Sequence, residues 1–522
     1  MLSIYNENEW LYPDTEVNKN THAHLHTAQN AYIGFQCILD PLEKFKLCHI
    51  QMNWEVEQPI ETEVFYLESI TVDENTDLEF MTTLDYERCK TFVTRQAPFK
   101  VYDCLIPWEK VESYEKRIPL YIQFKVGEGA VGEVRGILKL FIEDESKQQK
   151  VVEIVIKLQV YDKRLPEQKH QKLGMMNFFC YDNIVKNHGV TLNSKAYWAL
   201  YRLYVRRQLE MHCTHIMLPY AKSIRNEKNE VVDFDFTEVI KAGEIALEEG
   251  APFIVGACIA HWGEWNDKGY YLLWEPSIAA ESLEGYYQLK KYFCKWQSIV
   301  DEKGWNRRIM QSLADEPQVY NALSYRAIAS VFRKCVPGVN IIEAVETFNL
   351  GGGIDIWVPK QDTYEKHREK FQEIQDAGEQ IWYYTCAFPA GKIMNRSMDL
   401  PLLVSRYILW MVFYYGLSGF LHWGFNYYIG EDLYHEACCP HKGKKLPAGD
   451  AHIIYPGEKD VYRSMRYIAQ RAGAQDYELF KALPCIQQEQ VRRWMQKLCP
   501  SFKVYNTEVE QFESIRKLIL ES

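Results

Sequence analysis

Short runs of alternating apolar and polar residues make up the first third of the chain. The clearest of them are residues 32–39, 119–126, 135–142 and 151–161. A period of two residues is typical of strands with one buried and one exposed face, and no long amphipathic helix interrupts the region. A glycine-rich segment, residues 127–132, separates two of the runs as a hairpin connection would. We therefore predict an N-terminal β-sandwich over residues 1–166.

The pattern changes after a charged stretch at residues 162–172. Apolar, strand-like runs now alternate with helices whose apolar residues recur every three or four positions, as in residues 197–209. The strand-like runs are residues 173–180, 215–218, 252–260, 307–313, 339–344, 354–358, 380–386 and 419–425. Strands that alternate with helices pair in parallel, and eight of them favour a closed barrel over an open sheet. The sequence therefore predicts a (β/α)8 barrel of the TIM type over residues 167–483, with a helical extension, residues 484–522, packed on it.

Charge and composition narrow the classes of partner. The chain has 71 acidic and 60 basic side chains, a net charge of −11, so its summed field repels nucleic acid. The first residues do not resemble a signal peptide, and no apolar run reaches the ~18 residues that a membrane span requires. The 14 cysteines then indicate reduced thiols. We expect a soluble, cytoplasmic protein without membrane insertion, and its oligomeric state stays open.

Two adjacent carboxylates follow the fourth predicted barrel strand. The strand runs into Asp315 and Glu316, and Pro317 then stops it. In such barrels the working residues lie at the carboxyl ends of the strands. Like charges this close raise the pKa of one carboxyl, so one stays protonated while its neighbour is ionised, as acid-assisted glycoside cleavage requires. The alternative is a helix N-cap formed by Asp315, with Glu316 complementing the helix dipole.

Aromatic and polar residues recur at the other predicted strand ends. The chain has 14 Trp, 35 Tyr and 24 Phe, more than a core alone usually needs, so some are expected to line a binding surface. Aromatic faces stack on the C–H faces of sugar rings, while amide, carboxylate and imidazole groups bind hydroxyls. Each aromatic residue taken singly is explained by core packing, but the group favours a saccharide site. The candidate pocket residues are Trp262, Asp355, Trp357, Tyr384, His422, Trp423 and Asn426.

Two further clusters contain metal-ligand residue types. His22, His24 and His26 share one face of a predicted strand, but no acidic or Cys partner is near in sequence, which favours a solvated edge. Residues 435–441 contain His, Glu and Cys without the spacing of a zinc site. The glycines at 351–353 lack the Lys-Ser/Thr pair of a phosphate-binding loop. We therefore expect neither a metal nor an organic cofactor.

The order and spacing of several motifs carry a family resemblance. The motifs are residues 304–317, 355–359, 382–384, 406–410 and 419–426 in the predicted barrel, 28–36 in the sandwich and 476–478 in a closing helix. Together they resemble glycoside hydrolase family 123, and the match covers most of the barrel. The resemblance implies a β-sandwich before a (β/α)8 barrel, and β-N-acetylgalactosaminidase activity on the ends of glycans or glycolipids.

The resemblance also implies a retaining mechanism in which the substrate's own 2-acetamido group is the nucleophile. Glu316 would protonate the glycosidic oxygen and later activate water. Asp315 would orient the acetamide as it attacks the anomeric carbon to give an oxazolinium intermediate. The spacing agrees with this division, because an enzyme nucleophile would need its carboxyl about 5 Å from the acid, on the opposite side of the anomeric centre.

The expected function is removal of terminal β-linked N-acetylgalactosamine from a glycan or a glycolipid-derived oligosaccharide by an exo-glycosidase. Two alternatives remain open at this point. One is a non-catalytic glycan-binding protein on the same scaffold, and the other is a barrel glycosidase for another sugar, such as a β-N-acetylglucosaminide. The sequence does not distinguish the galacto from the gluco configuration, because one or two polar contacts read a single epimeric hydroxyl.

Overall fold

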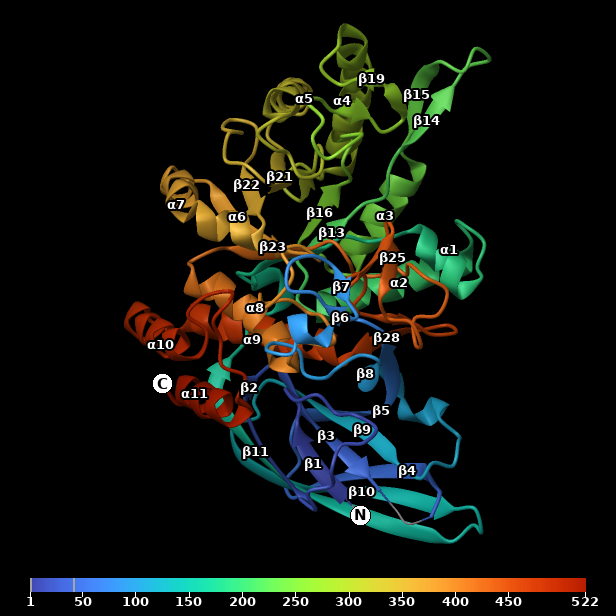
Figure 1. The fold of residues 1–522 in the computed structure, drawn as a ribbon, viewed down its shortest axis with the longest axis vertical. Helices are drawn as coiled ribbons and strands as arrows, with labels where there is room; N and C mark the ends of the chain where they lie inside the picture. Colours follow the sequence, from blue (N-terminus) through green and yellow to red (C-terminus); the bar gives the residue numbers. More distant parts are fainter. Residues whose placement is uncertain (1, 41–42) are drawn as a thin grey trace. The chain divides into compact units, whose positions relative to one another are not determined.

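The computed structural model describes residues 2–40 and 43–522 (Figure 1). The chain divides into two compact units. The first consists of the chain up to His170 together with Ala387–Tyr414 and Asn426–Ser522, and we call it the sandwich unit. The second consists of Gln171–Cys386 and Tyr415–Phe425, and we call it the barrel unit.

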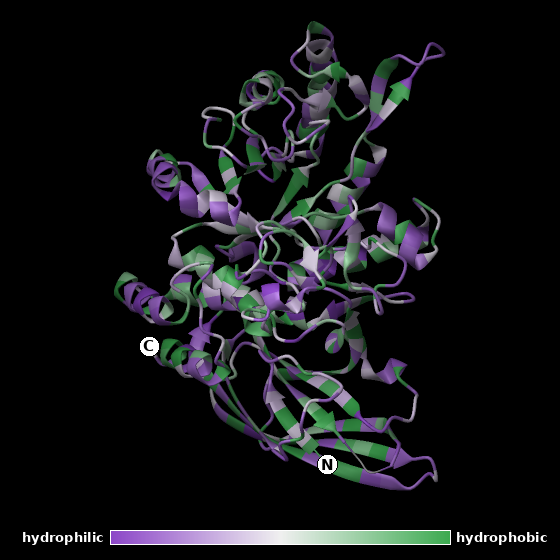
Figure 2. Ribbon diagram, in the orientation of Figure 1, coloured by the Kyte–Doolittle hydropathy of each residue, from purple (hydrophilic) through white to green (hydrophobic). Residues whose placement is uncertain are grey.

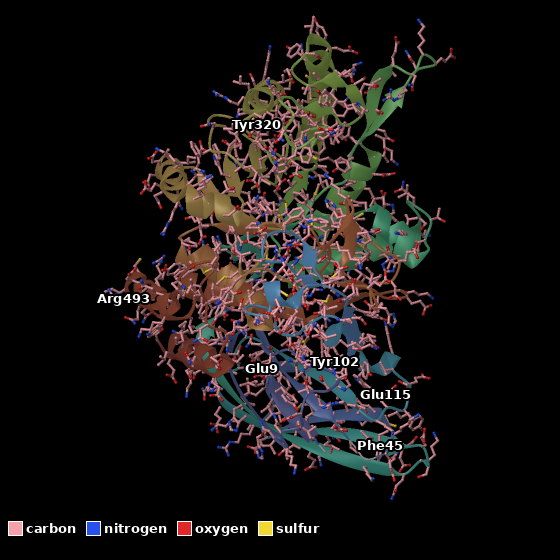
Figure 3. The ribbon with its side chains drawn as sticks, in the orientation of Figure 1. Glu9, Phe45, Tyr102, Glu115, Tyr320 and Arg493 are labelled. Carbon is pink, nitrogen blue, oxygen red and sulfur yellow. The ribbon has the colours of Figure 1, made fainter. Side chains whose placement is uncertain are left out.

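The sandwich unit is built on two sheets. In the described chain their strand orders are β1-β3-β9-β5-β8-β28-β27 and β2-β11-β10-β4. Neighbouring strands are antiparallel except β2 and β11. Phe45, at the start of β4, also pairs with Glu115 through two backbone hydrogen bonds (Figure 3). The strands are β1 (Leu2–Asn6), β2 (His22–Gln29), β3 (Ala31–Leu39), β4 (Phe45–Trp54), β5 (Ile60–Val72), β8 (Phe99–Pro107), β9 (Ile118–Val126), β10 (Gly132–Asp144), β11 (Gln149–Arg164), β27 (Tyr455–Pro456) and β28 (Val461–Ser464).

The alternating sequence pattern explains how these sheets pack. Along β10, every second residue is buried, including Leu138 and Leu140, and β11 follows the same rule with Ile156. Figure 2 shows the alternation of apolar and polar residues along these strands. The buried faces of the two sheets share one core, which joins Phe35 and Phe124 of the larger sheet to the residues of β10 and β11. The predicted antiparallel β-rich N-terminal region is confirmed.

Helices from the second half of the chain complete the sandwich unit. Arg406 of α8 forms a buried ion pair with Asp476 of α9, and Arg466 of α9 forms another with Asp103 of β8. Helix α9 also contacts β3 and β28. Because of these contacts, the compact units differ from the predicted division at residues 166 and 483. The helices are α8 (Leu402–Tyr414), α9 (Met465–Ala482), α10 (Cys485–Leu498) and α11 (Val509–Glu521).

The C-terminal extension is helical, as expected. Helix α10 packs against α8 and α9, whereas α11 contacts β2 and β11 of the sandwich. Its Arg516 donates to the backbone oxygen of His26 at 2.6 Å. The extension was expected to pack on the barrel. Phe512 of α11 packs against Tyr407 and Trp410 of α8, and Arg516 pairs with Asp476 of α9, so α11 contacts these two helices as well as the sandwich sheet. Short elements of the same unit are β6 (Asn75–Thr76), β7 (Thr82–Thr83), β25 (Cys439–His441), β26 (Lys444–Leu446), and the 3-10 turns Tyr86–Arg88, Trp108–Lys110 and Gln168–His170.

The barrel unit contains the predicted closed barrel. Among the described residues, parallel strands close in the order β12-β13-β16-β20-β21-β22-β23-β24, which is also their order along the chain (Figure 1). Each strand overlaps one of the strand-like runs of the sequence, so the barrel prediction is confirmed. The strands are β12 (Gly174–Asn177), β13 (His215–Met217), β16 (Phe253–Gly256), β20 (Ile309–Gln311), β21 (Asn340–Val345), β22 (Ile356–Pro359), β23 (Gln380–Thr385) and β24 (Gly419–His422).

Side chains of the strands fill the barrel interior. The core includes Ile342, Val358 and Trp382, all almost fully buried. A Cβ atom on Gly174 or on Gly419 would overlap the indole ring of Trp382. These two glycines therefore make room for a tryptophan inside the barrel, where packing is dense.

Helices and hairpins follow the barrel strands. Ser194 and Ser282 cap the N-termini of α2 and α4 with their hydroxyls, and Gly304 ends α4 in the left-handed conformation. No helix in the described part of the chain combines the length and the apolarity that a bilayer span requires. The helices are α1 (Asp182–His188), α2 (Lys195–Glu210), α3 (Thr237–Glu248), α4 (Leu283–Lys303), α5 (Ala322–Cys335), α6 (Gln361–Lys366) and α7 (Arg368–Asp376). The hairpin strands are β14 (Lys222–Arg225), β15 (Val231–Asp235), β17 (Ala260–His261), β18 (Tyr271–Leu272) and β19 (Glu275–Ala279).

Candidate active site

Asp315 and Glu316 lie on the loop that leaves the carboxyl end of β20. Helix α5 begins only at Ala322, with Asn321 in the N-cap position, so Asp315 does not cap it. Glu316 has a φ of 45°, in the left-handed region that residues other than glycine rarely adopt. Such a conformation costs about 1–3 kcal/mol and occurs mainly where the surroundings impose it, most often at functional sites.

The backbone of the loop is fixed from two sides. The carbonyl oxygen of Asp315 accepts hydrogen bonds from Nε1 of Trp262 at 3.2 Å and from the hydroxyl of Tyr270 at 3.3 Å. The predicted pocket residue Trp262 is therefore next to the acidic pair. Trp265 packs edge-on against Trp262 with 5.4 Å between ring centroids. Trp262 thus connects the loop of the acidic pair to a second indole, that of Trp265.

Glu343 of β21 holds the same loop from inside the barrel unit. Its Oε2 accepts the backbone N–H groups of Leu313 and Ala314 at 2.8 and 2.9 Å, and its Oε1 accepts the hydroxyl of Ser312 at 2.8 Å. Tyr325 of α5 donates to Oε2 as well, at 3.2 Å. Burial raises the pKa of Glu343 to about 8. This side chain is a scaffold for the loop, because its oxygens are occupied by the protein.

The two carboxyls of the pair reach solvent to different extents. Asp315 is exposed to solvent and Glu316 is partly exposed, yet protein atoms crowd both groups. Crowding raises the pKa of each, because it weakens hydration of the charged form. The charge of Asp315 raises the pKa of Glu316 further, whereas the backbone N–H of Glu316 donates to Asp315 and lowers the pKa of that carboxyl. Asp315 therefore ionises first, and Glu316 keeps its proton near neutral pH.

A second group of polar side chains surrounds Glu316. The hydroxyl of Tyr384, on β23, is within hydrogen-bond distance of Oε1 of Glu316 and lies 2.9 Å from Oε1 of Glu346. Glu346 follows β21, forms an ion pair with Lys360, and accepts the hydroxyl of Thr363 at 2.8 Å. The predicted pocket residue Tyr384 is thus in direct contact with the predicted acid.

His422 is the last residue of β24, the strand that pairs with β23, and Trp423 follows it. His422 is fully buried, and its Nδ1 accepts the backbone N–H of Gly424 at 3.0 Å. Trp423 is partly exposed, and its ring is nearly parallel to that of His422, at 20° and 6.4 Å between centroids. Both residues lie at the carboxyl end of the barrel, as Asp315 does, and their part in substrate binding stays a prediction.

Asp355 and Trp357 do not join this group. The sixth strand begins at Ile356, so Asp355 precedes it and lies at the amino end of the barrel. There Asp355 accepts from Arg333 at 2.9 Å and from the backbone N–H of Ile341 at 2.7 Å. Trp357 is buried, and its Nε1 donates to Glu379, which precedes β23. Both side chains serve contacts between strands and helices, and we remove them from the candidate pocket.

Asn426 belongs to the sandwich unit. It is fully buried and forms an antiparallel bridge with His452. Its role as a substrate contact stays a prediction.

The sequence contains two clusters of metal-ligand residue types, at His22–His26 and at residues 435–441. Across residues 2–40 and 43–522, no group of three His, Cys, Asp or Glu side chains could hold a metal ion. His22, His24 and His26 lie on β2, the edge strand of the smaller sheet, where His26 contacts the hydroxyl of Tyr161 at 3.1 Å.

Sequence reasoning missed Glu343, Glu346, Lys360 and Tyr270. The signal for Glu343 was present, because it is the one acidic residue within an otherwise apolar strand run at 341–345. A buried charge at such a position requires partners and so indicates a structural or functional role. For Glu346, Lys360 and Tyr270, only the fold brings the loops together.

Comparisons with known proteins agree with the motif resemblance. Residues 258–483 match the family model described as glycoside hydrolase 123, catalytic domain. A family 123 glycoside hydrolase from Clostridium perfringens, studied for glycolipid glycan hydrolysis, matches with a TM-score of 0.72 at 12% identity. The match covers 100% of this chain and 98% of that one, and at this identity it establishes the fold.

Other solved structures are much less similar. A GH39 β-xylosidase from Caulobacter crescentus matches with a TM-score of 0.39 at 11% identity, over 62% of this chain and 73% of that one. A GH10 xylanase with an Ig-like domain, from termite gut, gives 0.36 at 11% identity, over 69% and 91%. These two structures carry no argument about function. No curated protein matches the chain. The family model and the fold agree with the motif resemblance: this chain is a glycoside hydrolase, and its residues 258–483 match the catalytic domain of family 123.

Proposed function

We propose that the enzyme is a retaining exo-glycosidase that removes terminal β-linked N-acetylgalactosamine from glycans or glycolipid-derived oligosaccharides. The observation that carries this proposal is the pair of neighbouring carboxyls on one barrel loop, of which Asp315 ionises before Glu316. A protonated acid beside an ionised one is what acid-assisted glycoside cleavage requires. The glycolipid substrate is carried over from the C. perfringens enzyme as part of the proposal.

In the first step, Glu316 gives its proton to the glycosidic oxygen as the bond between that oxygen and the anomeric carbon breaks. The carbonyl oxygen of the 2-acetamido group forms the new bond to the anomeric carbon, and the ring that results is an oxazolinium ion. Asp315 accepts the acetamide N–H and stabilises its developing positive charge. The leaving alcohol departs with the proton of Glu316.

In the second step, the Glu316 carboxylate takes a proton from water as the water oxygen attacks the anomeric carbon. The bond to the acetamide oxygen breaks, and its electron pair restores the neutral amide. Two successive inversions retain the configuration of the sugar. The substrate supplies the nucleophile, because two neighbours in sequence do not flank an anomeric centre as an enzyme acid and nucleophile must, about 5 Å apart on opposite sides.

Aromatic side chains near the pair support a saccharide as the substrate. Trp262 contacts the Asp315 loop, and Trp423 is partly exposed at the same end of the barrel. Flat rings of this kind stack on the C–H faces of pyranose sugars. We assign the two tryptophans to the walls of the sugar site.

The test is hydrolysis of aryl N-acetyl-β-galactosaminide by the wild type, Glu316→Gln and Asp315→Asn. Each variant is expected to lose about 10²–10⁴-fold in kcat, because each removes one group of the acid–acetamide pair. Rates equal to that of the wild type would remove the residue from the mechanism. An aryl β-galactoside without the acetamide should not be cleaved, and a thiazoline mimic of the cyclised intermediate should inhibit strongly. Faster cleavage of the matched N-acetyl-β-glucosaminide would reassign the sugar.

A further inference from the structure

Four side chains next to the acidic pair form a connected set, which we call the proton-sharing cluster: Glu316, Tyr384, Glu346 and Lys360. The hydroxyl oxygen of Tyr384 lies between Oε1 of Glu316 and Oε1 of Glu346, within hydrogen-bond distance of both. Lys360 is almost fully buried and forms its ion pair with the same oxygen of Glu346. The set joins the loop after β20 to β23 and to the ends of β21 and β22.

The number of hydrogens in this cluster is limited. A phenol carries one hydrogen, so Tyr384 donates to one carboxyl at a time. Burial raises the pKa of Tyr384, so the phenol keeps that hydrogen. Two ionised carboxylates would leave one of them facing the phenol oxygen with no hydrogen between the two oxygens. Before cleavage, both contacts contain a hydrogen when one of the two carboxyls is protonated and donates to Tyr384.

Glu346 is the ionised carboxyl of the two. It receives the ammonium group of Lys360 and the hydroxyl of Thr363. A buried ammonium group needs a charged partner close to it, and protonation of Glu346 would neutralise the near carboxylate of Lys360, whereas that of Asp362 lies 3.9 Å away. The proton therefore belongs to Glu316, which donates it to the oxygen of Tyr384, while Tyr384 donates its own hydrogen to Glu346.

We propose that the Tyr384 hydroxyl turns between Glu346 and Glu316 during the reaction: its oxygen accepts the hydrogen of Glu316 before cleavage, and its hydrogen is donated to the Glu316 carboxylate afterwards. The negative charge of Glu346 favours the protonated form of Glu316 before cleavage. This inference rests on the proposed role of Glu316 as the acid. When the proton of Glu316 passes to the glycosidic oxygen, the hydrogen of Tyr384 rotates from Glu346 to the new carboxylate. No other proton moves, and the ion pair of Glu346 with Lys360 remains. Tyr384 and Glu346 are thus positioning residues.

Other charged groups near Glu316 shift its pKa but do not change hydrogen-bond partners during the reaction. Asp315 on the same loop raises its pKa, and Lys360 lowers it. Burial and the charges of Asp315 and Glu316 raise the pKa of Tyr270, which precedes β18, but the hydroxyl of Tyr270 donates to the backbone oxygen of Asp315. Among these neighbours, the Tyr384 hydroxyl is the group that contacts Glu316 and can also donate to a second carboxylate.

Two variants should move the pH dependence of kcat/KM in opposite directions. Tyr384→Phe removes the donor to the Glu316 carboxylate, so the pKa of Glu316 should rise and the basic limb should move up by about one pH unit. Glu346→Gln keeps an acceptor for Tyr384 but removes a negative charge, so the basic limb should move down by about one unit. Tyr383→Phe, a buried phenol on the same strand that points to its other face, is the control and should leave the limb in place.

Two substrates that differ in their leaving group distinguish the proposed role of Tyr384 from a loss of packing. The leaving group of phenyl N-acetyl-β-galactosaminide needs a proton. With this substrate, Tyr384→Phe should lose about tenfold or more in kcat/KM, because the variant impairs general-acid catalysis without removing the acid itself. With the dinitrophenyl analogue, which leaves without a proton, the loss should be small. Equal losses on both substrates, or shifts of both variants in the same direction, would overturn the proposal. Glu316→Gln in the same assay distinguishes the two proposals, because full activity of that variant would contradict the proposed function itself.

Discussion

Carboxyl groups are buried in both units. In the sandwich unit Asp103 and Asp476 pair with arginine, whereas Glu316 and Glu343 of the barrel unit do not. Asp476 in α9 contacts Arg406 at 2.7 Å and Arg516 at 3.2 Å. Glu316 and Glu343 form no ion pair with any residue that the structure describes, and their oxygens meet N–H and O–H donors. The two regions therefore place the same chemical group in opposite electrostatic surroundings.

The pKa values of these carboxyls depend on whether an arginine lies next to them. Burial alone would raise the pKa of Asp476, but the two guanidinium groups lower it below its usual value. Burial raises the pKa of Glu316 and Glu343, and no cation of comparable strength opposes it. A carboxyl with an arginine partner is fixed in its charged form and holds the fold together. A carboxyl without one can hold a proton near neutral pH, and only such a group can act as an acid catalyst.

The largest effect is expected when an arginine is removed from the sandwich unit. Arg466→Met would leave Asp103 buried without its partner, since both side chains are fully inaccessible. The free energy of unfolding should fall by about 3–5 kcal/mol, measured by chemical denaturation of the 522-residue chain. Adding Asp103→Asn should recover part of the loss. If the free energy of unfolding of Arg466→Met lies within about 1 kcal/mol of the wild-type value, the ion pair does not stabilise the fold.

An intermediate effect is expected for the pH dependence of stability. The folded-state pKa of Glu343 is raised, so its stabilising contribution is complete below its ordinary value of 4.5 and is lost as the pH rises towards about 8. The free energy of unfolding should fall by roughly 2 kcal/mol between about pH 5 and pH 8, and Glu343→Gln should flatten this slope.

The matched control for that slope is Asp476→Asn. The pKa of Asp476 is lowered, so its contribution is present above its ordinary value of 3.8 and is lost only as the pH falls further. This variant should be less stable throughout and keep the slope of the wild type between pH 5 and pH 8. The same slope in Glu343→Gln and the wild type would refute the assignment to Glu343.

The smallest effect is expected at the amino end of the barrel. The ion pair of Asp355 with Arg333 is about one third exposed on both sides, at 33% and 36%. Asp355→Asn should therefore cost less than about 1 kcal/mol of stability. Its kcat/KM should equal that of the wild type, because the side chain lies away from the acidic pair. A tenfold loss of kcat/KM would return Asp355 to the sugar site.

The sequence was sufficient where local pattern decides structure. Alternating runs predicted the sandwich strands, and each barrel strand falls in a predicted run. Asp315 and Glu316 could be found because a strand, two acids and a proline are consecutive. The same reasoning failed at Asp355, because the position of the motif placed this residue in the pocket although it lies at the amino end of β22, away from the catalytic end of the barrel.

The remainder depends on contacts between distant segments. Strand β28 joins the sandwich sheet by pairing with β8, although about two thirds of the chain separates them. Tyr384 lies on β23, whereas Glu346 and Lys360 directly follow β21 and β22, and only the barrel fold brings the three residues to Glu316. Sequence periodicity carries no information on such pairings, because it describes each segment alone.

The most direct test of the central claim is the dependence of Glu316→Gln on the leaving group. We expect this variant to lose about 10²–10⁴-fold in kcat/KM on phenyl N-acetyl-β-galactosaminide and to stay within about tenfold of the wild type on the dinitrophenyl analogue. That pattern would identify Glu316 as the proton donor. A loss of the same size on both substrates, or no loss on either, would contradict the account.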